Sequence, residues 1–100
     1  MKITHVVLLR FVPDFLSEEH VSYTAKLFAQ LQNAIPEILT VSVYQNCVQR
    51  NGNYDLMIAM ELSDTAALPV HLSHPLHIAF AESNRDYLLS RASFDYVPEN

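Results

Sequence analysis

Two histidines three residues apart, His74 and His77, flank Pro75 in segment 73–80. Proline lacks an amide hydrogen and fits the first position of a helix, so Ser73 or His74 is expected to cap a helix with His77 in its first turn. The positive end of a helix dipole opposes protonation of a side chain there. His77 is therefore expected to be neutral and to act as a base or a hydrogen-bond acceptor.

Asp95 is the carboxylate that we expect beside His77 and beside a further histidine, His5. If the first and last strands are antiparallel neighbours, the start of one lies opposite the end of the other, with Cβ atoms about 5 Å apart. A carboxylate next to imidazoles fixes their tautomers and raises their pKa values. We predict a proton-transfer group with His77 as general base, Asp95 as the residue that orients it, and His5 as the group that polarises a carbonyl.

The same histidines also have a purely structural interpretation. A histidine at a strand end or in a first helical turn is commonly satisfied by backbone or water, which would leave a non-catalytic binding protein. His71 is expected either in a cavity or on the surface, and His20 in solvent. The proline break disrupts the spacing that would aim several histidines at one metal, so no metal site is predicted. Cys47 is expected to be a buried, unreactive strand residue.

The composition restricts the partners and the location. Lys and Arg number 6 against 11 Asp and Glu, a net charge of −5, which provides no basic surface for nucleic acid or an anionic membrane. The apolar run at the N-terminus is too short to span a membrane. A single cysteine cannot form an internal disulfide, which favours the cytoplasm. A single glycine excludes glycine-rich phosphate loops, and no cofactor is predicted.

The elements that must position these residues follow from the apolar patterns. Strands are predicted over 3–11, 38–48, 54–62 and 91–97, and helices over 17–36, 63–73 and 74–89. The first helix is expected to bury a stripe of Val21, Ala25, Phe28, Leu31 and Ile35. This order is typical of a single α+β domain, 1–100, with the ferredoxin-like split βαβ fold, a four-stranded antiparallel sheet and helices on one face.

The predicted strands are apolar on both faces, and the helices can cover only one of them. The helix-free face is therefore expected to pack against the same face of a second copy, giving a homodimer with a barrel shared between subunits. Between helices and sheet we expect a pocket for a small, partly apolar ligand, lined by Val7, Leu9, Phe28, His71 and Phe80.

Five segments carry a resemblance to the stress-responsive dimeric α/β-barrel (Dabb) family: 4–11, 35–36, 54–55, 74–80 and 94–96. The resemblance spans nearly the whole chain and implies a ferredoxin-like protomer and a homodimer with the sheets face to face. In polyketide cyclases of the family, the histidines matching His5 and His77 are implicated in cofactor-independent aldol cyclisation, and the aspartate matching Asp95 orients the latter. Other expectations from this architecture are a non-catalytic stress-response dimer and, more remotely, a cofactor-free monooxygenase.

Overall fold

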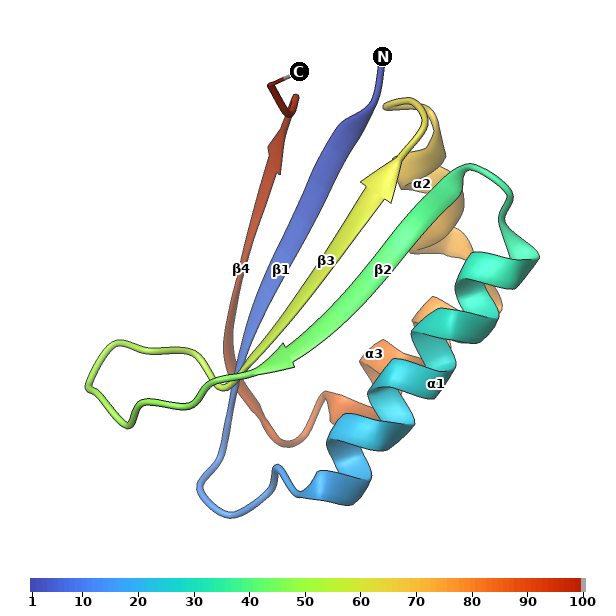
Figure 1. The fold of residues 1–100 in the computed structure, drawn as a ribbon. Coiled ribbons are helices and arrows are strands. Elements are labelled where there is room, and N and C mark those ends of the chain that lie inside the picture. Colours follow the sequence, from blue (N-terminus) through green and yellow to red (C-terminus); the bar gives the residue numbers. More distant parts are fainter. Residues whose placement is uncertain (100) are drawn as a thin grey trace.

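The computed structural model describes residues 1–99 and consists of one sheet covered by helices on one face (Figure 1). The elements are β1 (Ile3–Phe11), α1 (Glu18–Ala34), β2 (Ile38–Gln45), β3 (Leu56–Leu62), α2 (Ala67–Ser73), α3 (Pro75–Asn84) and β4 (Leu88–Tyr96). The four strands are antiparallel in the order β2-β3-β1-β4. The predicted ferredoxin-like α+β fold is confirmed.

The register between β1 and β4 decides which side chains meet at the site. His5 lies opposite Asp95, Val7 opposite Ser93, and Leu9 opposite Arg91. Because side chains alternate between the two faces of a strand, all these residues point to the same face. That face carries the helices, so polar groups of β4 lie across from the apolar side chains of β1.

The hydrophobic core lies between the helices and this face of the sheet. The fully enclosed side chains include Leu31, Leu56, Met60 and Leu62. The core face of α1 differs from the predicted stripe, because Thr24 and Leu27 are buried whereas Ala25 is exposed. The buried residues Thr24, Leu27 and Leu31 follow the i, i+3 and i+7 spacing of one helix face. Ala25 lies outside this face.

No helix covers the other face of the sheet in the described part of the chain (Figure 1). Val6 and Leu8 of β1 point to this face between Ala59, Met57 and Phe94 of the neighbouring strands. Three large aromatic side chains are exposed on or beside it: Tyr44, Phe94 and Tyr96. The predicted apolar character of both faces is therefore present.

The boundaries around the β2–β3 hairpin were predicted incorrectly. β2 ends at Gln45 rather than at residue 48, and a long loop precedes β3. The side-chain amide of Asn46 donates to the Val48 carbonyl, and the Asn53 amide donates to the Asn46 side-chain oxygen, so local bonds replace strand pairing. Cys47 lies in this loop and is exposed, contrary to the predicted buried position.

The end of α3 and the start of β4 also differ from the prediction. α3 ends at Asn84, and β4 begins at Leu88, so the connection contains only three residues. The Tyr87 amide closes it by donating to the Asn84 carbonyl over 3.0 Å. Because β4 starts before the predicted residue 91, Arg91 lies inside the strand and not at its first position. α2 begins at Ala67 without a side-chain cap, because Asp64 accepts from the Ala66 amide in the preceding turn instead.

Candidate functional site

The start of α3 is built as the proline motif predicts. Pro75 occupies the first turn, and His74 is the N-cap residue with an extended backbone. The Nδ1 atom of His74 accepts a hydrogen bond from the Leu76 amide over 3.1 Å, which satisfies one of the free donors of the helix end. His77 therefore stands in the first turn of α3, where its ring faces α2.

The backbone of α2 fixes the tautomer of His77. Its Nδ1 lies 3.2 Å from the carbonyl oxygen of Leu72. A carbonyl oxygen can only accept, so Nδ1 carries the hydrogen and Nε2 of the neutral ring keeps a free lone pair. Burial lowers the pKa of His77, and nearby Arg91 and His5 lower it further, whereas the Leu72 hydrogen bond opposes the shift. His77 is thus arranged as a neutral base.

His5 and Asp95 form a close pair across β1 and β4. The Nδ1 atom of His5 donates to Oδ1 of Asp95. The predicted contact between these strand ends is present, but Asp95 is bonded to His5, and the Leu72 carbonyl has taken the place expected for it beside His77. His5 is 5% exposed, and the other ring nitrogen, Nε2, is buried without a partner among residues 1–99.

His71 lies between these two histidines. Its ring centroid is 5.8 Å from that of His5 and 4.6 Å from that of His77, both in edge-on geometry. Only 1% of the residue is exposed, which places it in the interior. Burial, with smaller contributions from charge on His77, His5 and His74, lowers the pKa of His71 to about 3. The ring is therefore neutral near neutral pH.

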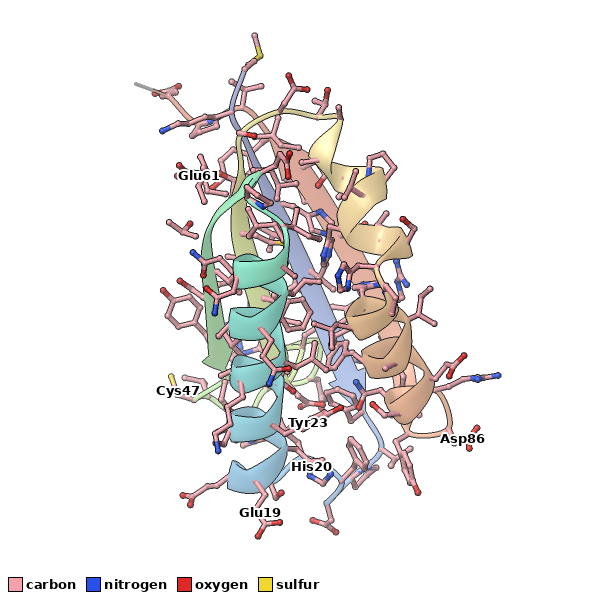
Figure 2. The ribbon with its side chains drawn as sticks, turned by 90° about the vertical axis from the view of Figure 1, so that its right-hand side faces the viewer. Glu19, His20, Tyr23, Cys47, Glu61 and Asp86 are labelled. Atoms are coloured by element: carbon pink, nitrogen blue, oxygen red, sulfur yellow. The ribbon has the colours of Figure 1, made fainter. Side chains whose placement is uncertain are left out.

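A cavity of about 470 Å³ contains these groups and lies between the helices and the sheet. Figure 2 shows that side chains fill the space between α1 and the α2–α3 pair. All five predicted lining residues are present: Val7, Leu9, Phe28, His71 and Phe80. Such a volume, with apolar walls and a few polar groups, is typical of a site for a small molecule.

Five polar lining residues were absent from the predicted site: Glu82, Asn84, Arg85, Arg91 and Ser93. Asn84 follows His77 by seven residues, a spacing that places both on one helix face, and this signal was available in the sequence. Arg91 precedes Asp95 by four residues in the predicted strand 91–97, and the alternation of a strand places both on one face, so this signal was also available in the sequence.

A larger hollow of about 830 Å³ lies at the other end of β1, beside the loop between β2 and β3. Its lining is mostly polar loop side chains and contains no histidine. Within residues 1–99, no three His, Cys, Asp or Glu side chains are placed to share a metal ion. None of the helices there is long and apolar enough to cross a membrane. The cavity lined by His5, His71 and His77, called the histidine cavity from here on, is therefore the candidate site.

The family model of the stress-responsive A/B barrel domain (Dabb) matches residues 3–98. The chain belongs to the Dabb family. No curated protein sequence matches this Dabb chain significantly.

Solved structures with the same fold come from several organisms. A dimeric ferredoxin-like protein of unknown function from Thermobifida fusca YX is 23% identical, with 98% of this chain and 92% of that chain covered and a TM-score of 0.79. The hydroxynitrile lyase of Passiflora edulis is 16% identical (99% and 94% covered, TM-score 0.77). A candidate antibiotic biosynthesis monooxygenase from Bacteroides thetaiotaomicron is 17% identical (99% and 90% covered, TM-score 0.78). These similarities establish the fold of the Dabb chain.

Proposed function

We propose that this Dabb protein binds a small, partly apolar ligand in the histidine cavity and transfers protons to and from it without a cofactor. The observation that carries the proposal is the fixed tautomer of His77, whose Nε2 lone pair is free on the wall of a cavity that also holds the His5–Asp95 pair. A neutral imidazole with one free nitrogen is suited to general base catalysis.

The proposed chemistry divides the work between two histidines. His77 Nε2 removes a proton from an acidic C–H or O–H of the ligand. For a C–H next to a carbonyl, the electron pair of the broken bond moves onto the carbonyl oxygen. His5, whose ring is held by the hydrogen bond to Asp95, directs Nε2 toward that oxygen and polarises it where the negative charge develops. Return of the proton from His77 completes the cycle.

Two similarities support lyase or cyclase chemistry. The Passiflora edulis structure with this fold is a hydroxynitrile lyase. The two ends of the chain are also similar to the plant polyketide cyclase olivetolic acid cyclase, with His5, His77 and Asp95 at the matching positions. Where that enzyme has a cavity tyrosine, this chain has His71, and its helix aromatic and tyrosine are replaced by Ala25 and Phe28. We therefore propose the type of chemistry and a different ligand.

Homodimer formation through the helix-free sheet face is part of the proposal. That face exposes Tyr44, Phe94 and Tyr96, and burial of such a surface favours association. Related structures from Thermobifida fusca and Jannaschia are described as dimeric. The single cysteine suits a reducing compartment, so we propose a cytoplasmic protein with the stress-related role for which its family is named.

The test is hydrogen–deuterium exchange into a panel of small ketones with acidic C–H groups, followed by proton NMR in D₂O. The wild-type protein is expected to accelerate exchange of at least one ketone, and His77→Ala is expected to abolish the acceleration while the protein remains folded by circular dichroism. Ile78→Ala, an exposed neighbour on α3, is the matched control and should retain it. Retained exchange in His77→Ala would remove the proposed role of this residue.

The non-catalytic alternative makes different predictions. If the histidines only hold the sheet and helices together, His5→Ala and His77→Ala should lower the melting temperature, no ketone should exchange, and no compound should raise the melting temperature. That set of results would contradict the proposed function as a whole.

A further inference from the structure

Three buried side-chain nitrogens lack a hydrogen-bond partner within residues 1–99, and all three belong to residues on the wall of the histidine cavity. They are Nε2 of His5, Nδ1 of His71 and Nδ2 of Asn84. Native proteins rarely leave buried polar atoms unpaired, because the loss of hydration is then not compensated. Their concentration in one cavity indicates that its occupant supplies the missing partners.

The unpaired groups mark two separate ends of the cavity. His77, beside His71, and Asn84 lie seven residues apart on α3, which is two helical turns, or about 10 Å along the helix axis. Phe80 and Ala81 lie between them and also line the cavity. Glu82 and Arg85 also border the cavity toward its Asn84 end, so polar groups lie at both ends, with the apolar side chains Phe80 and Ala81 between them.

The two ends of the cavity favour different chemical groups on the ligand. The Asn84 amide nitrogen can only donate, so it requires an acceptor oxygen. At the histidine end, Arg91 lines the cavity, and its charge is felt by His77. Within residues 1–99, Arg91 has no ion-pair partner. The Asp95 carboxylate of the cavity is bonded to His5 and not to Arg91, so the Arg91 guanidinium, next to imidazoles, favours an acidic group on the ligand.

We infer that the cavity binds an elongated organic acid that places its carboxylate near Arg91 and the histidines and a second oxygen, about 10 Å away, on the Asn84 amide. This inference rests on the proposed function and extends it by naming the class of ligand and a binding residue, Asn84. Asn84 also borders a second hollow next to Phe15, Thr24 and Tyr87, so the position of the ligand must be measured directly.

Two probe acids test the inference, octanoate and 8-hydroxyoctanoate. Their extended chains are about as long as two helical turns, about 10 Å, and only the second carries an oxygen at the far end. Dissociation constants come from titrations of ¹⁵N-labelled protein followed by NMR. We expect 8-hydroxyoctanoate to bind wild-type protein about three to ten times more tightly than octanoate, the usual size of one hydrogen bond.

The variants separate the hydrogen bond from general effects. Asn84→Leu and Asn84→Ala should each bring the ratio of the two dissociation constants to about one. Two different substitutions are used so that the test still stands if one of the variants does not fold. Ser83→Ala is the matched control, because Ser83 lines only the second hollow and donates to the Phe80 carbonyl. It should keep the wild-type ratio. Nuclear Overhauser effects should connect the ligand chain to the methyl groups of Val7 and Leu9.

The outcomes distinguish this inference from the proposed function. If octanoate binds in the cavity but the hydroxyl gives no advantage, or if the advantage survives in both Asn84 variants, the role of Asn84 is overturned and ligand binding stands. Overhauser effects to the Thr24 methyl group would also overturn it, because they place the chain in the second hollow. If neither acid binds, the inference of an acid ligand is overturned, and the deuterium-exchange experiment still decides the proposed proton transfer.

Discussion

Asp95 is bonded to His5, the residue directly opposite on β1, although His77 lines the same cavity. The strand register imposes this pairing, because His5 and Asp95 face each other in the β1–β4 ladder. His77 takes its orientation from the Leu72 carbonyl instead. The two histidines can therefore carry out different steps, with one paired to a carboxylate and the other free at Nε2.

The His5–Asp95 pair is expected to stabilise the fold. Asp95→Ala leaves the buried Nδ1 atom of His5 without an acceptor, so the free energy of unfolding should fall by about 1–3 kcal/mol. Asp95→Asn keeps an acceptor oxygen and should lose less. Urea unfolding followed by circular dichroism measures both. The control is Asp86→Ala in the exposed turn after α3 (Figure 2). Equal stability of Asp95→Ala and Asp86→Ala would contradict the prediction.

Stability should depend on pH through His71. Burial and the charges of neighbouring histidines lower its pKa from 6.5 to about 3. Below pH 6.5 the unfolded chain binds a proton that the folded chain does not, until the pH approaches 3. The free energy of unfolding should thus fall with decreasing pH by up to about 1.4 kcal/mol per unit in this window, and this residue should have no effect above it.

His71→Gln removes this titrating group and tests the effect. Between pH 7 and pH 5, the wild-type protein should lose about 2 kcal/mol more stability than the variant, measured by urea unfolding at both values. Ser73→Ala serves as the control, because Ser73 is exposed and does not titrate, and this variant should follow the wild-type curve. Parallel curves for the wild-type protein and His71→Gln would show that His71 is not held neutral.

The cap of α3 should depend on the acceptor of His74. His74→Ala removes the bond to the Leu76 amide and should destabilise the protein by about 1 kcal/mol. His74→Asn, whose side-chain oxygen can accept the same bond, should recover most of the loss. Thermal unfolding of the three proteins under one set of conditions gives the comparison. A cap without energetic value would leave all three melting temperatures equal.

The helix-free face should hold the proposed dimer together. Phe94 is 67% exposed in the single chain and points to this face, because its partner Val6 does so. Phe94→Glu introduces a charge there and should produce monomers in sedimentation velocity experiments. Ile78→Glu, on the exposed side of α3, should leave the assembly unchanged. A monomeric wild-type protein at micromolar concentration would contradict the expected association.

Much of the fold and of the candidate site could be predicted from the sequence, because local residue chemistry and the spacing of apolar residues determine these features. Pro75 and His74 specify the start of α3, and the alternation in β1 specifies two apolar faces. The topology then brought His5 and Asp95 together, as the strand order requires. These features depend on residues close in sequence or on one simple pairing rule.

Other features depend on tertiary contacts that no local pattern encodes. The bond from His77 to the Leu72 carbonyl requires the angle between α2 and α3, so the sequence suggested Asp95 in its place. The local bonds of Asn46 and Asn53 ended β2 early and exposed Cys47. Thr24 and Leu27 replaced Ala25 in the core because the rotation of α1 follows its packing on the sheet.

Measuring which nitrogen of His77 carries a hydrogen tests the proposed proton transfer most directly. Two-bond ¹H–¹⁵N correlation spectra of the histidine rings distinguish the tautomers in the folded protein. At pH 7.5, we predict that His77 is neutral, with its hydrogen on Nδ1 and none on Nε2, as the Leu72 carbonyl demands. A hydrogen on Nε2 of His77 would leave no lone pair for the ligand and would contradict its role as a base.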